Sequence, residues 1–226
     1  MGNTVLTYFD AYCERAGDAG FFAEPLNLAT NLFFIIGAAI AARAIARMPA
    51  YAKRWDLWAL FVFMVAIGIG SALWHLSPTR YTLLMDVIPI GLFINLYLIC
   101  ALRRVFGLSW GRVTAYWLAY TVAGTLAQRL LPPDMLNGTV MYLPTYATIV
   151  IMAVALWLSD RPVGRIFIVV VAVWTLSLIF RTIDMDVCPT LDIGTHFLWH
   201  TLNAWVLWRL LMVLIAYKKS IITNNH

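Results

Sequence analysis

Residues 56–76 read DLWALFVFMVAIGIGSALWHL, and only the first and the penultimate of them, Asp56 and His75, carry an ionisable side chain. An apolar run of about 20 residues is long enough to cross the hydrocarbon core of a bilayer as a helix. In hydrocarbon each backbone amide must find its hydrogen bond inside its own segment, which favours a helix over an isolated strand. We therefore expect residues 56–76 to span a membrane.

Six further apolar runs of similar length follow the same pattern, separated by short polar breaks. The seven expected spans cover about 26–46, 56–76, 81–102, 112–131, 139–158, 163–181 and 193–216. Connections this short favour one bundle over two separate domains. The sequence thus predicts an all-α, polytopic membrane protein with a seven-transmembrane-helix bundle. Residues 1–226 form a single domain in this prediction, and residues 1–25 are its N-terminal segment.

The composition agrees with a membrane protein. Hydrophobic residues make up 62% and charged residues 12% of the 226 residues, against about 45–50% and about 25% in soluble domains. The mean hydropathy is +0.81. These values exclude a soluble α/β enzyme, a disordered chain and a nucleic-acid-binding protein, so the net charge of +5 is interpreted as a sign of membrane topology.

The distribution of Lys and Arg predicts the orientation, because cytoplasmic loops are enriched in both. Four of these residues lie on one side of the expected bundle, namely Arg15, Arg80, Arg129 and Arg181. Twelve lie on the other side, namely Arg43, Arg47, Lys53, Arg54, Arg103, Arg104, Arg112, Arg161, Arg165, Arg209, Lys218 and Lys219. We expect the N-terminus outside or in a lumen and the C-terminus in the cytoplasm. The host membrane would be a bacterial cell membrane or a eukaryotic ER or Golgi membrane.

Five polar residues stand out because they fall inside the expected spans at similar depth. His196 and His200 are four residues apart, and so are Ser71 and His75, so each pair shares one helix face. A short hairpin returns Asp86 to about the depth of His75. Since ionisable groups within a bilayer are costly, their presence in the outer third of the bundle indicates a functional site.

The three histidines predict a metal site. Three neutral imidazoles are a common protein ligand set for catalytic zinc (Zn²⁺), with the fourth position left to water. Zinc acidifies that water and polarises a carbonyl group. The alternative is that interfacial histidines extend toward the headgroups or form hydrogen bonds between helices, and this alternative is strongest for any one histidine taken alone.

The same residues resemble a known family. Ser71-x3-His75-x10-Asp86 and His196-x3-His200 resemble the alkaline ceramidase family, which belongs to a wider group of seven-helix membrane hydrolases that includes the adiponectin/progestin receptor family. Similar ceramidase segments are Tyr12-Cys13-Glu14, Ala23-Glu24-Pro25-Leu26-Asn27 and Asp186-Val187-Cys188.

The resemblance implies roles for these residues. His75, His196 and His200 would hold zinc, and Asp86 would orient the attacking water or act as general base. Ser71 would help to stabilise the oxyanion that forms when water attacks an amide. The substrate would be a ceramide, cleaved to a fatty acid and a sphingoid base.

The acidic N-terminal segment departs from the family pattern. Calcium-dependent ceramidases carry an acid three positions before the glutamate of the Cys-Glu pair, where this chain has Ala11. Glu14, Asp18 and Glu24 remain candidate ligands for calcium (Ca²⁺), which binds oxygen atoms. The alternative is a solvated acidic segment in which Glu24 and Pro25 begin the first span.

The chain has three cysteines. Cys13 and Cys188 are both expected on the outer side, where disulfides persist, and the resemblance pairs them. Cys100 is expected near the cytoplasmic end of its span as a packed thiol.

The predicted function is therefore zinc-dependent hydrolysis of the N-acyl amide of ceramide-like lipids. Its partner is a membrane lipid substrate, and neither nucleic acid nor an obligate protein partner is implied. A lipid-ester hydrolase would use the same chemistry, and a receptor-like signalling protein could carry a structural zinc on the same scaffold. A transporter is disfavoured, because no internal repeat with broken helices is visible.

Overall fold

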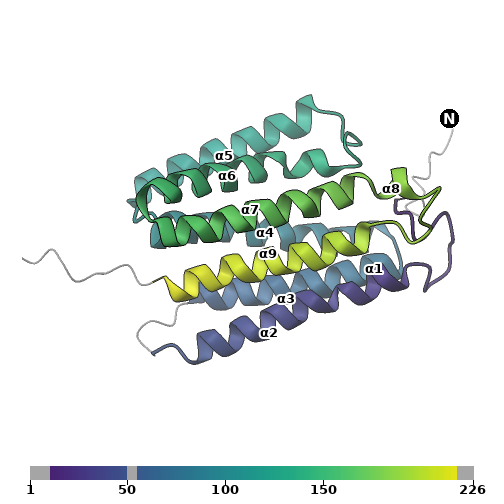
Figure 1. Cartoon of the computed structure of the whole chain (residues 1–226), viewed down its shortest axis with the longest axis horizontal. Coiled ribbons are helices and arrows are strands. Elements are labelled where there is room, and N and C mark those ends of the chain that lie inside the picture. Colours follow the sequence, from purple (N-terminus) through teal and green to yellow (C-terminus); the bar gives the residue numbers. More distant parts are fainter. Residues whose placement is uncertain (1–10, 50–54, 218–226) are drawn as a thin grey trace, which may run out of the picture.

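The computed structural model describes residues 11–49 and 55–217, and within these ranges it is helical without any strand. The long helices lie side by side in a bundle (Figure 1). They are α2 (Leu32–Ala46), α3 (Trp55–Leu76), α4 (Arg80–Arg104), α5 (Trp110–Leu130), α6 (Leu143–Ser159), α7 (Arg161–Thr182) and α9 (His196–Ala216). Three short helices join them, α1 (Pro25–Thr30), η3 (Thr139–Tyr142) and α8 (Asp184–Val187).

Within the described residues, six helical segments are long and apolar enough to cross a membrane. They are Pro25–Ala46, Trp55–Leu76, Arg80–Arg104, Thr139–Ser159, Arg161–Val187 and His196–Ala216. The prediction of an all-helical, multi-pass membrane protein is thus confirmed. Helix α5 lies where the sequence predicts the fourth span but is not among the six. It is more polar than its neighbours and has only one buried residue, Val113.

The core of the bundle surrounds α9, which lies between α3 and α7 in Figure 1 and is the most buried of the six segments. Fully buried side chains from four helices meet there, namely Phe34, Leu60, Phe167 and Leu211. Helices α5 and α6 lie on the far side of α7 from α3 (Figure 1). The outer helix α5 therefore forms a wall of the bundle rather than part of its core.

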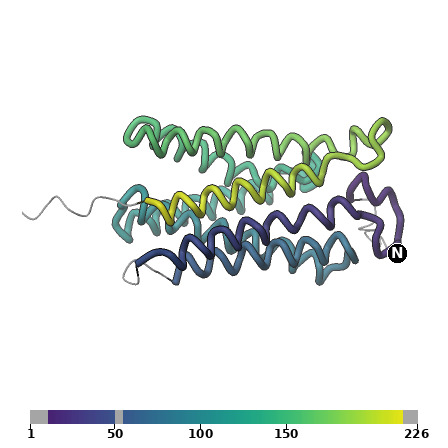
Figure 2. The backbone as a smooth tube through the Cα atoms, turned by 60° about the horizontal axis from the view of Figure 1, so that its bottom comes forward, coloured from purple at the N-terminus to yellow at the C-terminus, as the bar shows by residue number. Residues whose placement is uncertain are grey.

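One end of the bundle gathers the segments that carry the candidate site. Figure 2 shows residues 11–24 at the same end as the connection between α7 and α9. Helix α3 ends there and α4 and α9 begin there. Lys53, Arg54, Lys218 and Lys219, which contribute to the predicted orientation, lie outside the described residues.

A disulfide joins residues 11–24 to the connection before α9. Cys13 and Cys188 are bonded, with their Cα atoms 5.5 Å apart, which confirms this prediction. Cys100 is free and buried. The N-terminal segment is thus attached covalently to the end of the bundle where the three histidines lie.

Candidate metal centre

His75, His196 and His200 come together as expected from the sequence. All three are at most 1% exposed, and one nitrogen from each lies within 4.8 Å of the others. Among the described residues this is the group of side chains that could hold a metal ion. The last turn of α3 supplies His75, and the first two turns of α9 supply His196 and His200.

A buried carboxylate orients His75. Its Nδ1 lies 2.5 Å from Glu24 Oε2, and Asn27 donates a hydrogen bond of 3.0 Å to the same oxygen. Burial raises the pKa of Glu24, but hydrogen bonds from His75, Arg15 and Asn27 outweigh it, so the pKa lies below its usual value. Because an ionised carboxylate only accepts hydrogen bonds, His75 must carry its proton on Nδ1.

A hydroxyl group orients His200 in the same way. Thr30 Oγ1 lies 3.0 Å from His200 Nδ1 and donates its own hydrogen at 2.7 Å to the carbonyl of Leu26. With its hydrogen directed at Leu26, Thr30 is arranged to accept from His200, which would place the proton of His200 on Nδ1 as well. In neutral imidazoles protonated in this way, the Nε2 atom of each histidine carries a lone pair.

These two atoms face each other, since His75 Nε2 and His200 Nε2 are 3.1 Å apart. Two nitrogens that both carry lone pairs repel at this distance unless a proton or a metal ion binds them. Zinc bound tetrahedrally at about 2.0–2.1 Å would hold two nitrogens about 3.3 Å apart. The three-imidazole donor set and the spacing of this pair thus suit zinc, and His75 and His200 each have the outer partner that metal-binding histidines usually have.

His196 is held through its backbone. Asp184, fully buried, accepts the backbone N–H of His196 at 2.9 Å and that of Thr195 at 2.7 Å on one oxygen. Its other oxygen accepts the N–H of Cys13 at 3.0 Å. Gly194 has φ +60°, and a Cβ there would lie 2.2 Å from Asp184 Oδ1, so only glycine fits. This carboxylate fixes the start of α9 and was missed by the sequence analysis.

Ser71 lies one turn before His75 on α3, and Asp86 on α4 is brought to the same end of the bundle because α3 and α4 touch. A Cβ at Gly70 would be 1.9 Å from the carbonyl oxygen of Met85, so the two backbones meet at that point. Ser71 is 2% and Asp86 8% exposed. Within the described part of the chain, Ser71 Oγ and Asp86 Oδ1 have no hydrogen-bond partner. Buried polar atoms left unpaired in this way suit groups that bind a ligand or water.

The three acidic residues considered for calcium do not form a metal-binding group within the residues described. Both oxygens of Glu14 accept backbone N–H groups at the start of α1, from Leu26 and Asn27. Asp18 accepts the N–H of Gly20 within a turn. Glu24 pairs with His75 and with Arg15. Each acid thus has a structural partner in the protein.

A cavity leads from this site into the bundle. It has a volume of about 470 Å³, is lined mainly by α4, α5 and α6, and reaches Asp86, Arg181 and Tyr12. The centroid of the Tyr12 ring lies 3.9 Å from that of the His196 ring and 4.9 Å from that of the His75 ring. Tyr12 therefore stands between the cavity and the histidines.

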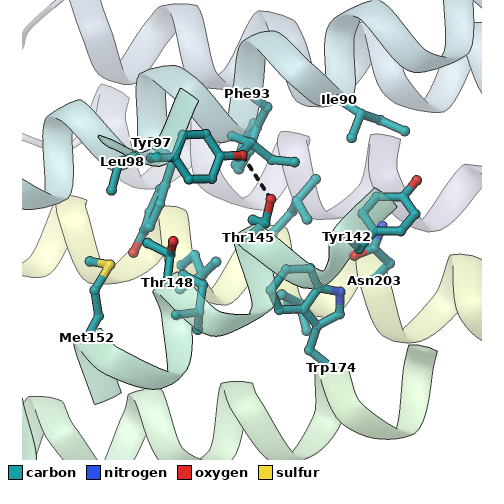
Figure 3. A pocket seen from close by; sticks show the side chains of 16 residues that line it. Ile90, Phe93, Tyr97, Leu98, Tyr142, Thr145, Thr148, Met152, Trp174 and Asn203 are labelled. Atoms are coloured by element: carbon teal, nitrogen blue, oxygen red, sulfur yellow. Dashed lines mark hydrogen bonds between the residues drawn. The ribbon is translucent and has the colours of Figure 1, made fainter. Parts of the chain in front are cut away.

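A narrower space of about 50 Å³ lies next to the cavity and shares Ile90, Tyr142 and other wall residues with it. Figure 3 shows its largely apolar walls, with Phe93, Tyr97, Met152 and Trp174 around it. At the wider end, the Cζ atom of Arg181 lies 5.7 Å from the ring centroid of Tyr142 and 5.3 Å from that of Trp199. The combined space is polar near the histidines and apolar at depth.

The known protein families and the curated proteins provide no relative with which this site can be compared. No model of a known protein family matches the chain, and no curated protein matches it. What the chain does must therefore be inferred from its residues and their contacts.

Proposed function

We propose that this protein is an intramembrane, zinc-dependent amidohydrolase that cleaves the N-acyl amide of ceramide-like lipids. The observation that carries the proposal is the buried cluster of His75, His196 and His200, in which the Nε2 atoms of His75 and His200 lie 3.1 Å apart. Ser71 and Asp86 beside them, matching the ceramidase-like pattern of the sequence, favour hydrolysis over a purely structural metal. A metal that only held the bundle together would need neither a buried carboxylate nor a cavity at its side.

His75, His196 and His200 would hold the zinc, which supplies Lewis acidity toward a carbonyl oxygen and lowers the pKa of a water molecule. The unpaired oxygen of Asp86 would accept the proton of the attacking water and pass it to the leaving nitrogen. The hydroxyl of Ser71 would donate a hydrogen bond to the carbonyl oxygen as negative charge develops on it. The products are a carboxylic acid and an amine.

The shape of the cavity supports a lipid as the substrate. Its volume of about 470 Å³ is in the range of small-molecule sites, roughly 300–1,000 Å³. The polar end near Asp86 would receive the amide and head group, and the apolar depth would receive a hydrocarbon chain. A substrate of this kind could reach the site from the bilayer without crossing water.

We further propose that α5 completes seven spans and that the histidine end faces outside or a lumen. Six neighbouring helices that could span a membrane support this topology, since α5 runs alongside α6 (Figure 1). The excess of Lys and Arg at the opposite end supports the orientation.

The direct test is an assay of purified protein with fluorescent ceramide, phytoceramide and phospholipid, each with and without a zinc chelator. We expect release of fatty acid from the amide substrates, loss of release with chelator and its return on adding zinc. Cleavage of phospholipid alone would favour the lipid-ester hydrolase. Absence of any hydrolysis by zinc-loaded protein would move the receptor-like alternative ahead.

A substitution that narrows the cavity tests whether it holds the lipid chain. Gly124 of α5 lines the cavity, and a Cβ added there meets no atom within 4 Å. We expect Gly124→Leu to fold normally and to lower kcat/KM for long-chain ceramide by roughly tenfold, since a few lost or clashing methylenes are worth about 1–3 kcal/mol. Gly111→Leu is the matched control, because Gly111 is equally open but lies outside the cavity. Equal activity of both variants on long and short chains would contradict this placement.

A further inference from the structure

The side chain of Arg15 is the most unusual feature of the N-terminal segment. It is 2% exposed, although arginine is almost never fully buried unless its charge is paired. Its Nε donates to Glu24 Oε1 at 2.6 Å. Nη1 donates to the carbonyl oxygens of Asp18 at 2.9 Å and Gly20 at 3.0 Å, and Nη2 donates to that of His75 at 2.7 Å.

The oxygen atoms around Arg15 are of the kind that a hard divalent cation takes. Such cations bind carboxylate and backbone carbonyl oxygens, and Arg15 has one carboxylate oxygen and three carbonyl oxygens around its guanidinium. At least four of its five N–H donors are thus directed at oxygens. The positive charge of the guanidinium is permanent, and no chelator can remove it.

This arrangement holds His75 at two points. Arg15 binds the backbone carbonyl of His75 in the last turn of α3, where a positive charge is favourable. It also binds Glu24, whose second oxygen fixes the imidazole. The backbone and the ring of one candidate metal ligand are therefore both positioned by the same ion pair.

We infer that the guanidinium of Arg15 takes the place of a bound divalent cation in the N-terminal segment, so that the metal centre is organised without calcium. The inference rests on the proposed function only in taking the three histidines as a zinc site. Arg15 is a positioning residue, which acts on zinc through Glu24 and His75. The acidic segment that the sequence analysis considered for calcium is then neutralised from within the chain.

Cation rescue tests this inference with two measurements that need no catalytic activity. The midpoint of thermal unfolding and the zinc retained after dialysis against a chelator of graded strength are measured in excess EGTA and in millimolar calcium. Wild-type protein should give the same midpoint, within about 1 °C, and the same zinc retention in both buffers. Arg15→Ala should unfold about 5–15 °C lower in EGTA, because it leaves a buried carboxylate unpaired, and should retain less zinc.

Calcium should restore a large part of both losses in Arg15→Ala, since the vacated oxygens suit it. Arg80→Ala is the control, because Arg80 is an exposed arginine near the same end of the bundle, and it should behave like the wild type in both buffers. If Arg15→Ala does not fold, Arg15→Lys and Arg15→Gln replace it, and only the glutamine variant should respond to calcium.

Stabilisation of the wild type by calcium would overturn the inference, and so would an Arg15→Ala protein that is destabilised without any rescue. Neither result would bear on hydrolysis, which the lipid assay tests separately. Conversely, a protein that hydrolyses no lipid could still show the expected calcium response.

Discussion

Purified His200→Ala protein is expected to contain almost no zinc and to release no fatty acid above background. His200 supplies one of the two nitrogens that face each other at 3.1 Å, and its loss leaves two ligands. Loss of an outer partner alone typically weakens metal binding 10–100-fold, so loss of the ligand itself should exceed about 100-fold. Metal content per chain, measured by mass spectrometry after gel filtration, checks the prediction.

The control for this variant is Thr201→Ala, at the next position of α9. The Thr201 hydroxyl bonds only within its own helix, to the carbonyl of Phe197 among the described residues. The Thr201→Ala protein should retain about one zinc per chain and wild-type activity. Full zinc content in His200→Ala would remove this histidine from the metal site.

Asp86→Asn is expected to retain zinc and fold but to lose turnover by roughly 10²–10⁴-fold, the usual contribution of a general base. Asparagine keeps the shape of the side chain but cannot take up the proton of water. Ser71→Ala should likewise keep zinc and lose about 10²–10³-fold if its hydroxyl stabilises the oxyanion. Both variants are measured as kcat on ceramide together with zinc content.

The matched control is Asp134→Asn, which removes an exposed carboxylate from the connection between α5 and α6. Its activity should equal that of the wild type. Near wild-type turnover in Asp86→Asn would show that Asp86 is not the base. A partial loss of zinc with activity kept would instead make Asp86 a residue that tunes the metal.

The helices could be predicted because the length of an apolar run nearly determines a membrane helix. The expected span 81–102 corresponds to Arg80–Arg104, where the capping box of Thr79 and Thr82 sets the start. The expected span 26–46 is divided at Asn31 into α1 and α2. Apolar periodicity does not reveal such a break, because it depends on polar side chains that bond the local backbone.

The site was predictable where its residues follow helix spacing and depth. His196 and His200 share a face by their spacing, and the hairpin between α3 and α4 brings Asp86 to His75. Arg15, Thr30 and Asp184 were missed, because their roles depend on contacts with residues far away in the sequence. Arg15 reaches a carbonyl 60 positions later, and no local pattern encodes that distance. The sequence did contain one signal of this role, since Arg15 lies among Glu14, Asp18 and Glu24, whose negative charges would otherwise repel one another.

The disulfide at Cys13 tethers the N-terminal segment to the end of the bundle where the three histidines lie. The disulfide attaches the segment at Cys13, two residues before Arg15, and helix α1 holds its other end from Pro25 onward. Tyr12, Arg15 and Glu24 therefore lie close to these two attachment points. The two residues from Cys13 to Arg15 span at most about 7 Å when fully extended. If the ion pair between Arg15 and Glu24 breaks, Arg15 therefore remains near Glu24. A tether this short keeps the effective concentration of Arg15 around Glu24 in the millimolar range or above. Local unfolding of the segment would then be followed by rapid return of Arg15 and Glu24 to the histidines.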